Sequence, residues 1–439
     1  MVAKNILLLS YRDYRGDGVA AYNLAKYLHD SHYNVSMVVS EKTKTDRFIV
    51  TTYLQEFKNT SLPLRMYKRA ARQLNKKFFE NKTYKFSDFD NKYDFFVDQE
   101  ITSHLSAEAI LNSISFTPDL VLVASMHDLV NTTELAKINE LTKAPIYLIM
   151  MDMFPLTGGC HHAWDCKGFE FGCSSCPAIL NDAFKDRAAK NFKLKIENVR
   201  KANMQVIAGS GRALGQAKNS LLFKDQKVIH NINGFVDQAI FNTHSRQYAK
   251  HLFGLNADDK VIFTGAEHVS NERKGFKYFL EAIRNLYDIV TDAERLSLIV
   301  MIAAKAEQNQ ELLTQIPFRI KFIEFIQDDR LLSVAYQAAE VFVCSSIEDP
   351  GPITVSQAMA CGTPVAGFYM GAISNLVINN ENGFKAPLRD SVQLAAGILH
   401  LLRLSNEEFA SYSKNAVEQV AKHSSKTHFL HTIDEILNN

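Results

Sequence analysis

Short apolar runs alternate with stretches of helical periodicity along most of the chain. This alternation is typical of βαβ units, which build parallel sheets. Apolar runs predict a first series of strands at 5–10, 35–40, 120–124, 146–150 and 206–209, and a second series at 261–265, 298–303, 320–325 and 341–344. The predicted fold class is therefore α/β, with two Rossmann-like halves joined near residues 225–240.

The length of the chain agrees with this division. A chain of 439 residues is too long for one ordinary core and suits two domains of roughly 200 residues each. The expected domains are 1–230 and 231–410, followed by a helical segment at 411–439. The first domain carries an insertion at 43–105 and a cysteine-rich loop at 157–177.

Composition narrows the class of protein. With 46% hydrophobic and 22% charged residues the chain is typical of a globular protein, and its net charge of +1 gives no overall attraction to nucleic acid. The longest apolar run, around Leu296–Ala304, is much shorter than the ~20 residues of a membrane span. We expect a cytoplasmic protein, whose six cysteines are thiols or metal ligands rather than disulfides.

The segment from Cys344 to Gly371 carries the strongest chemical signal. A strand end is followed by an acidic turn with Glu348 and Asp349, then by Gly351 between two prolines, and then by a helix that can start near Ile353. Open α/β sheets bind phosphorylated ligands where a strand's carboxyl end meets a helix N-terminus. The segment therefore predicts such a site.

Other polar residues follow predicted strands. Thr264-Gly265 closes a strand, and Arg273-Lys274-Gly275 opens the next helix, where cations can stabilise a phosphate. In the first half, Gly16 and Gly18 precede a predicted helix at Val19–His29, and His127 and Asp152 follow the strands at 120–124 and 146–150.

Together these segments resemble the retaining glycosyltransferases of family 4 with the GT-B fold, and the resemblance covers most of the chain. It implies two Rossmann-like domains that face each other across a cleft, with the final helix crossing back to the first domain. It also implies a nucleotide-diphosphate-sugar donor, a carbohydrate or lipid-linked acceptor, and no requirement for a catalytic divalent metal. His230 to Asp237, with Asn233-Gly234, resembles the interdomain segment of the family.

The resemblance gives roles to individual residues. Lys274 matches the family's diphosphate-binding lysine, Glu348 would accept hydrogen bonds from donor-sugar hydroxyls, and His127 would contact the donor sugar. These three are the expected catalytic residues. The expected donor site comprises Arg273, Gly265, Glu348, Asp349, Gly351, Ile353, Thr354 and Gln357, and the expected acceptor or phosphate loop comprises Gly16, Gly18 and Asp152.

Three positions differ from the family pattern. Gln357 stands where a glutamate usually meets the nucleotide ribose, Ala266 where an arginine is common, and Met151 where a histidine is common. Two alternatives therefore stay open beside the transferase: a non-catalytic nucleotide-sugar-binding or scaffold subunit, and a nucleotide-sugar epimerase of the same fold.

Four cysteines lie within seventeen residues: Cys160, Cys166, Cys173 and Cys176. The spacing C-x5-C-x6-C-x2-C is compatible with a closed, structural zinc site. Free thiols, an iron–sulfur cluster and disulfides are the alternatives. The loop resembles one found in a subset of the family that builds bacterial surface polysaccharides such as capsule and exopolysaccharide, the colanic-acid-type transferases.

The insertion contains a basic segment. From Arg65 to Lys85 there are eight Lys or Arg residues against the single acid Glu80. Such a segment can lie as an amphipathic helix on the cytoplasmic face of the membrane or face an anionic acceptor. The alternative is a solvated helix that packs by one face on the domain.

Overall fold

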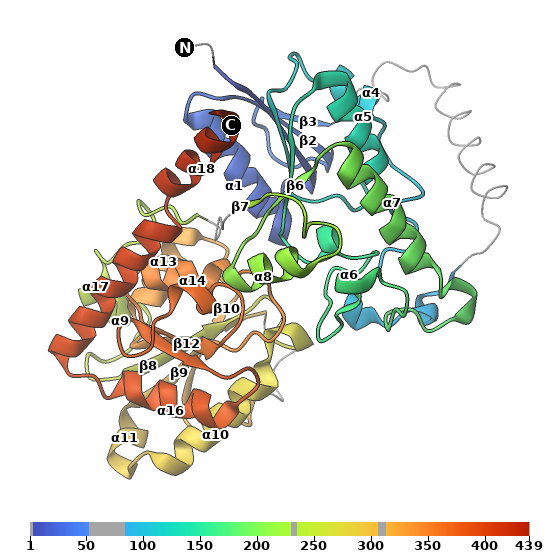
Figure 1. Ribbon diagram of the computed structural model, residues 1–439. Helices are drawn as coiled ribbons and strands as arrows, with labels where there is room; N and C mark the ends of the chain where they lie inside the picture. Colours follow the sequence, from blue (N-terminus) through green and yellow to red (C-terminus); the bar gives the residue numbers. More distant parts are fainter. Residues whose placement is uncertain (1–2, 52–83, 230–234, 306–312, 439) are drawn as a thin grey trace, which may run out of the picture. The chain divides into compact units, whose positions relative to one another are not determined.

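The computed structural model describes residues 3–51, 84–229, 235–305 and 313–438. The chain divides into two compact units: Met1–Ile207 with Gln216–Ile229, and Ala208–Gly215 with His230–Asn439. Each unit contains one parallel sheet and its helices, so the predicted α/β fold class with two Rossmann-like domains is confirmed (Figure 1). Residues 65–83 of the basic segment and Asn233-Gly234 lie outside the described residues.

The first unit is built on a seven-stranded sheet. In spatial order its strands are β3 (Ile49–Thr51), β2 (Asn34–Glu41), β1 (Asn5–Arg12), β4 (Leu120–Val123), β5 (Ile146–Ile149), β6 (Gln205–Ile207) and β7 (Val228–Ile229). Its α-helices are α1 (Gly16–Asp30), α4 (Ala107–Asn112), α5 (Thr132–Thr142), α6 (Gly168–Phe171) and α7 (Arg187–Lys201). Short 3-10 turns are η1 (Phe86–Asp88), η2 (Asn91–Tyr93), η3 (Phe154–Leu156) and η4 (Asp182–Phe184).

The sequence of β1 explains its central place in this sheet. Ile6, Leu7, Leu8 and Leu9 have no exposed surface, as expected for a parallel strand covered on both faces. Leu8 is in register with Met37 on one side and Leu122 on the other. Because the chain proceeds from β1 to β2 in one direction and to β4 in the other, the strand order reverses between β1 and β4.

The second unit has a six-stranded sheet. Its strands in spatial order are β10 (Arg319–Glu324), β9 (Leu298–Ala304), β8 (Lys260–Gly265), β11 (Val341–Cys344), β12 (Val365–Phe368) and β13 (Gly383–Ala386). Its α-helices are α9 (Arg246–Leu252), α10 (Phe276–Ile289), α11 (Asp292–Ser297), α13 (Asp329–Gln337), α14 (Ile353–Ala360), α15 (Ile373–Leu376), α16 (Ser391–Leu402), α17 (Asn406–His423) and α18 (Lys426–Asn438), and η5 spans Glu272–Lys274. α8 (Gly211–Asn219) contributes its first residues to this unit.

Helices pack on both faces of the second sheet. α10 contacts α16, which covers β12 and β13, whereas α14 contacts α13 and α17 (Figure 1). The strand order reverses between β8 and β11, which are joined in register at Ile262 and Phe263. At that point the Thr264 hydroxyl donates a hydrogen bond to the carbonyl of Val343 over 2.9 Å. This reversal positions the loops that carry the predicted donor residues.

Some elements differ from the sequence-based expectation. α1 begins at Gly16 instead of Val19, so Gly16 and Gly18 lie inside the helix. The segment after Glu407 is two helices, broken at Ser424, and α18 packs within the second unit, where Phe429 stacks on Phe235. Its expected contact with the first domain stays a prediction. Among the helices of the described ranges, none is long and apolar enough to cross a bilayer.

Candidate active site

In the second unit, the predicted donor residues follow two adjacent strands at the reversal of strand order. Lys274 comes after β8, and Glu348 and Asp349 come after β11. The carboxyl ends of parallel strands at such a reversal form the crevice in which open α/β sheets bind ligands. The structure therefore brings these three side chains to one edge of the sheet.

Lys274 and Asp349 form an ion pair. Lys274 Nζ lies 2.9 Å from Asp349 Oδ2, and about a third of the lysine side chain is exposed. Asp349 also accepts a hydrogen bond from the Gly351 amide over 3.1 Å. Burial alone would raise the pKa of Asp349, but the Lys274 ammonium outweighs it and the pKa is lowered. The ionised carboxylate therefore holds the ammonium at the sheet edge.

The backbone around Lys274 is fixed by the loop after β11. Ser345 Oγ donates to the carbonyl of Lys274 over 2.8 Å, and the Ile347 amide donates to the carbonyl of Arg273 over 2.8 Å. Gly275 has φ 63°, and a Cβ there would lie 2.0 Å from the carbonyl oxygen of Ser345. Only glycine fits this close approach, which brings the two loops together.

Glu348 is buried and lies next to a cation that sequence reasoning missed. Arg212 Nη2 is 3.8 Å from Glu348 Oε2, and the segment with Arg212 belongs to the second unit. The Gly211 amide of that segment donates to Asn375 Oδ1 over 2.8 Å. Arg212 could have been predicted from the sequence, because the triplet Ser-Gly-Arg at Ser210 to Arg212 follows the strand predicted at 206–209.

The remaining donor residues surround the start of α14. Ile353 and Thr354 form its first turn after Pro352, and the free amides of a helix N-terminus favour anions. Gln357 lies one turn later, where its Oε1 accepts a hydrogen bond from the Tyr336 hydroxyl over 3.4 Å. Tyr336 is buried, which raises its pKa well above the usual value, so its hydroxyl stays a donor.

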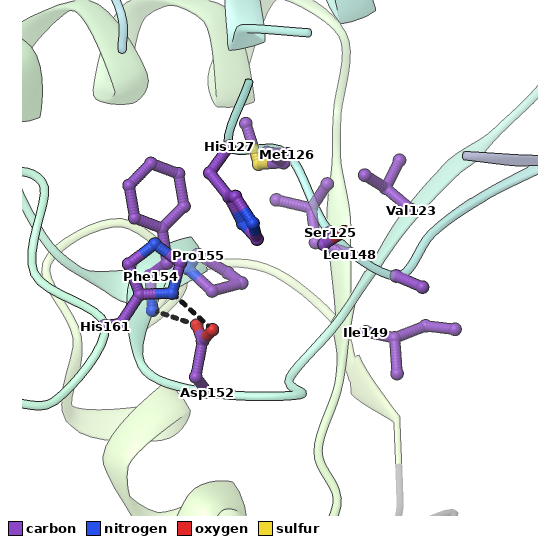
Figure 2. Close-up of a pocket in the computed structure, with 11 residues that line it drawn as sticks. Val123, Ser125, Met126, His127, Leu148, Ile149, Asp152, Phe154, Pro155 and His161 are labelled. Carbon is purple, nitrogen blue, oxygen red and sulfur yellow. Dashed lines mark hydrogen bonds and ion pairs between the residues drawn. The ribbon is translucent and has the colours of Figure 1, made fainter. Parts of the chain in front are cut away.

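In the first unit, two histidines and an aspartate line one pocket (Figure 2). His127 follows β4 and Asp152 follows β5, as predicted, and His161 comes from the cysteine-rich loop. His161 Nδ1 lies 2.6 Å from Asp152 Oδ2, and the two imidazole rings are 5.0 Å apart in an edge-to-face arrangement. Sequence reasoning missed His161 as a member of this group.

Burial and charge give the two histidines opposite pKa shifts. The pKa of His127 is lowered, chiefly by burial and then by His161. Burial would also lower the pKa of His161, but the Asp152 carboxylate outweighs burial and raises it. Correspondingly, burial would raise the pKa of Asp152, whereas His161 lowers it.

A buried lysine supports this pocket from α7. Lys195 Nζ donates to the carbonyl of Phe154 over 2.7 Å and lies 3.8 Å from Glu100 Oε1. The Phe154 amide in turn donates to Asp152 Oδ1 over 2.7 Å (Figure 2). Burial lowers the pKa of Lys195. The lysine thus fixes the turn after β5 that presents Asp152.

The predicted phosphate loop is the first turn of α1. Asp17 pairs with Arg12 over 3.2 Å, which places an anion in that turn. A Cβ on Gly18 would lie 2.8 Å from the Arg12 side chain, so glycine allows α1 to pack against the end of β1. This turn follows β1, which pairs with β4, the strand that precedes His127.

The four cysteines Cys160, Cys166, Cys173 and Cys176 are free thiols that line one small, largely apolar pocket. Burial raises the pKa of Cys173 to about 12 and that of Cys176 to about 11. Among the residues the structure describes, no group of three or more His, Cys, Asp or Glu side chains is arranged to hold a metal ion. The predicted zinc site is therefore not supported.

The cysteine-rich loop packs instead on the described end of the insertion. Phe95 and Cys160 form an antiparallel bridge, and the Phe96 amide donates to the carbonyl of Gly159 over 2.8 Å. Trp164 Nε1 donates to the carbonyl of Lys92 over 2.8 Å. These bonds hold His161 at the pocket.

Part of the second unit is similar to a known sequence family. Residues 258–404, within the second unit, match the family described as "Glycosyl transferases group 1". A similar curated protein is the N-acetyl-alpha-D-glucosaminyl L-malate synthase of Bacillus anthracis, 21% identical over 42% of this chain and 46% of that protein. The chain spans about half the length of the first curated relatives it matches.

Two solved structures resemble the whole chain. Sucrose-phosphate synthase from Thermosynechococcus elongatus has a TM-score of 0.61 at 15% identity, covering 99% of this chain and 98% of that one. HepE of Anabaena, in complex with UDP and glucose, has a TM-score of 0.59 at 15% identity, covering 100% of both chains. At this identity the likeness shows the fold, and the predicted GT-B fold is confirmed.

Proposed function

We propose that this chain is a retaining glycosyltransferase of family 4, which moves a sugar from a nucleotide-diphosphate-sugar donor to a polysaccharide or lipid-linked acceptor. The observation that carries the proposal is the grouping of Lys274, Glu348 and Asp349 where the strand order of the second sheet reverses. This grouping lies in the segment that matches the group 1 glycosyltransferases. Synthesis of bacterial surface polysaccharide is the proposed setting, on the resemblance of the cysteine-rich loop.

The residues of the second unit suit the departure of a nucleoside diphosphate. Negative charge develops on the leaving diphosphate, and fixed cations and backbone amides stabilise it in the transition state. Lys274, held by Asp349, and Arg273 would supply the positive charge, and the first turn of α14 would supply the amides. Glu348, beside Arg212, would accept hydrogen bonds from hydroxyls of the transferred sugar.

The proposed donor is a uridine diphosphate sugar, because a structure of the same fold was solved with UDP and glucose. We propose that no divalent metal takes part, since cationic side chains and helix N-termini can stabilise the leaving group. Transfer in the presence of EDTA tests this part of the proposal.

The first experiment measures transfer by the purified chain from a panel of UDP-sugars to lipid and polysaccharide extracts, with products identified by mass spectrometry. Lys274→Met should reduce transfer by about 100- to 1,000-fold, because one fixed stabilising charge is lost. The matched control is Lys277→Met, since Lys277 is an exposed lysine on α10. It should transfer sugar at the wild-type rate.

The outcomes separate the proposal from its alternatives. Equal rates for Lys274→Met and wild type would show that the diphosphate site is wrongly assigned. Tight binding of UDP-sugars by calorimetry, without transfer or hydrolysis, would instead support a scaffold subunit. An epimerised nucleotide sugar among the products would support the epimerase.

A further inference from the structure

The pocket of the first unit contains two buried imidazole nitrogens without hydrogen-bond partners. His127 Nδ1 and His161 Nε2 have almost no exposed surface, and neither has a hydrogen-bond partner in the protein. His161 as a whole is only 5% exposed. A buried polar atom without a partner costs free energy, so such atoms in a native protein call for a ligand or a water.

The surroundings fix both rings. The Asp152 carboxylate holds His161 Nδ1, and Nε2 lies on the side of the ring away from that carboxylate (Figure 2). Phe96 packs against both imidazoles, with ring centres 5.3 Å from His127 and 4.8 Å from His161. Phe154 covers His161 from another side at 4.7 Å. The two nitrogens are therefore preorganised.

The size and chemistry of the pocket select the group that can enter it. Its free space is about 10 Å³, which is room for one water-sized group. Apart from the histidines, Asp152 and Ser125, its walls are apolar side chains such as Val123, Leu148 and Pro155. A phosphate or a whole sugar ring is too large for this space. A hydroxyl fits, and it can accept a hydrogen bond from one imidazole while donating to the other.

We propose that His161, oriented by Asp152, binds a single hydroxyl of a carbohydrate substrate beside His127 and determines specificity for that hydroxyl. The inference rests on the proposed transferase activity and adds His161 to the sugar contact already expected of His127. The hydroxyl can belong to the transferred sugar or to the acceptor, and the experiment distinguishes the two.

The test compares substrates that lack one hydroxyl each. Wild-type protein is assayed with deoxy analogues of the donor sugar and of the acceptor, and the same series is repeated with His161→Gln and Asp152→Asn. One analogue should lower kcat/KM of the wild type by roughly 10- to 100-fold, since the missing hydroxyl leaves buried polar atoms of the pocket unpaired. That penalty should largely disappear in both variants, because the hydrogen bond is already lost or misoriented.

If the penalty disappears in the series of donor analogues, the hydroxyl belongs to the transferred sugar; if it disappears in the series of acceptor analogues, the hydroxyl belongs to the acceptor.

The matched control is His32→Asn. His32 is exposed and precedes β2, so it lies at the amino-terminal ends of the strands, whereas the pocket lies at their carboxyl ends. Its φ is 74°, a conformation that asparagine tolerates. This variant should keep the wild-type penalties. Far-UV circular dichroism and thermal unfolding identify any variant that fails to fold, and Asp152→Asn serves if His161→Gln does so.

A binding measurement covers the case in which wild-type protein transfers no sugar, so that the proposed activity itself has failed. Protein labelled with ¹⁵N at histidine is titrated with methyl glucoside, methyl mannoside and myo-inositol. A shift of the ring-nitrogen signals of His127 and His161, with none at His32, would support the pocket. Unchanged signals with all three probes, or deoxy penalties that are the same in wild type and His161→Gln, would overturn it and leave a bound water as the occupant.

Discussion

At the scale of single residues, the nature of Gln357 decides how the second unit would hold a nucleotide. Its amide oxygen accepts a bond from the buried Tyr336 hydroxyl, which leaves the amide nitrogen for other partners. A glutamate could keep the bond from Tyr336 and would add charge. Charge-assisted hydrogen bonds are about twice as strong as neutral ones.

We therefore expect Gln357→Glu to bind UDP about 3- to 10-fold more tightly than wild type, because the ribose hydroxyls would donate to a carboxylate. Calorimetry with UDP measures the change. Gln357→Leu, which removes both hydrogen-bonding groups, should bind more weakly. Equal affinity of all three proteins would remove position 357 from the proposed nucleotide site.

The ion pair of Lys274 and Asp349 predicts a pH dependence of stability. The pKa of Asp349 in the folded state is lowered below its usual value of 3.8. Its contribution is therefore present above pH 3.8 and is lost as the pH falls through the lower, folded-state pKa. Because Lys274 is about one third exposed, the contribution should be modest, roughly 1 kcal/mol.

Asp349→Asn tests this dependence by urea unfolding at a series of pH values. The variant should be less stable than wild type above pH 3.8, and the difference should shrink as the pH falls below that value. A difference that grows on acidification would show that burial, and not Lys274, dominates at this carboxyl group.

At the scale of elements, the sequence predicts those strands whose apolar pattern is visible within the strand itself. Strands such as β1 and β9 were recognisable because parallel strands buried on both faces are continuous apolar runs. β13 was missed because it has four residues, two of them only partly buried. The position of the predicted site residues after strands could be predicted for the same reason, since strand ends are visible in the sequence.

His161 could not be found in this way. Its partner Asp152 is nine residues earlier in the chain, and the turn after β5 together with the bridge between Phe95 and Cys160 brings the two together. Those contacts join segments far apart in sequence. The cysteine spacing led to a zinc prediction that the described residues do not support, because spacing alone does not fix how side chains are arranged in the folded loop.

Because Lys195 joins α7 to the turn after β5, we expect the loss of its side chain to lower the stability of the first unit strongly. Lys195→Met should destabilise the first unit by about 3–5 kcal/mol, because it leaves the buried Glu100 carboxylate without its cation. Glu100 Oε2 would still accept bonds from the amide and hydroxyl of Thr132. Chemical denaturation measures the loss.

The control is the double variant Lys195→Met with Glu100→Gln. It removes both charges and keeps an acceptor for Thr132, so it should recover much of the lost stability. If the double variant were as unstable as Lys195→Met alone, the lysine would act through packing on Phe154, over whose ring it lies at 3.8 Å, and not through its charge.

At the scale of the whole molecule, each unit has its own parallel sheet and its own core. Val261 and Phe263 of β8, with Met301 of β9, belong to a core cluster of the second unit. The two reversals of strand order place one candidate site on each sheet. A ligand of one site should therefore stabilise first the unit that carries it.

This division into two units predicts where UDP would protect the chain. Amide hydrogen exchange should slow at 272–275, after β8, and at 345–357, which comprises the loop after β11 and the first residues of α14, because a ligand that binds only the folded state stabilises it. At 100 times its dissociation constant the stabilisation is about 2.7 kcal/mol. Lys274→Met should abolish the protection at the same UDP concentration. Protection that is absent from both loops in wild type would contradict the proposed diphosphate site, whatever activity the chain shows.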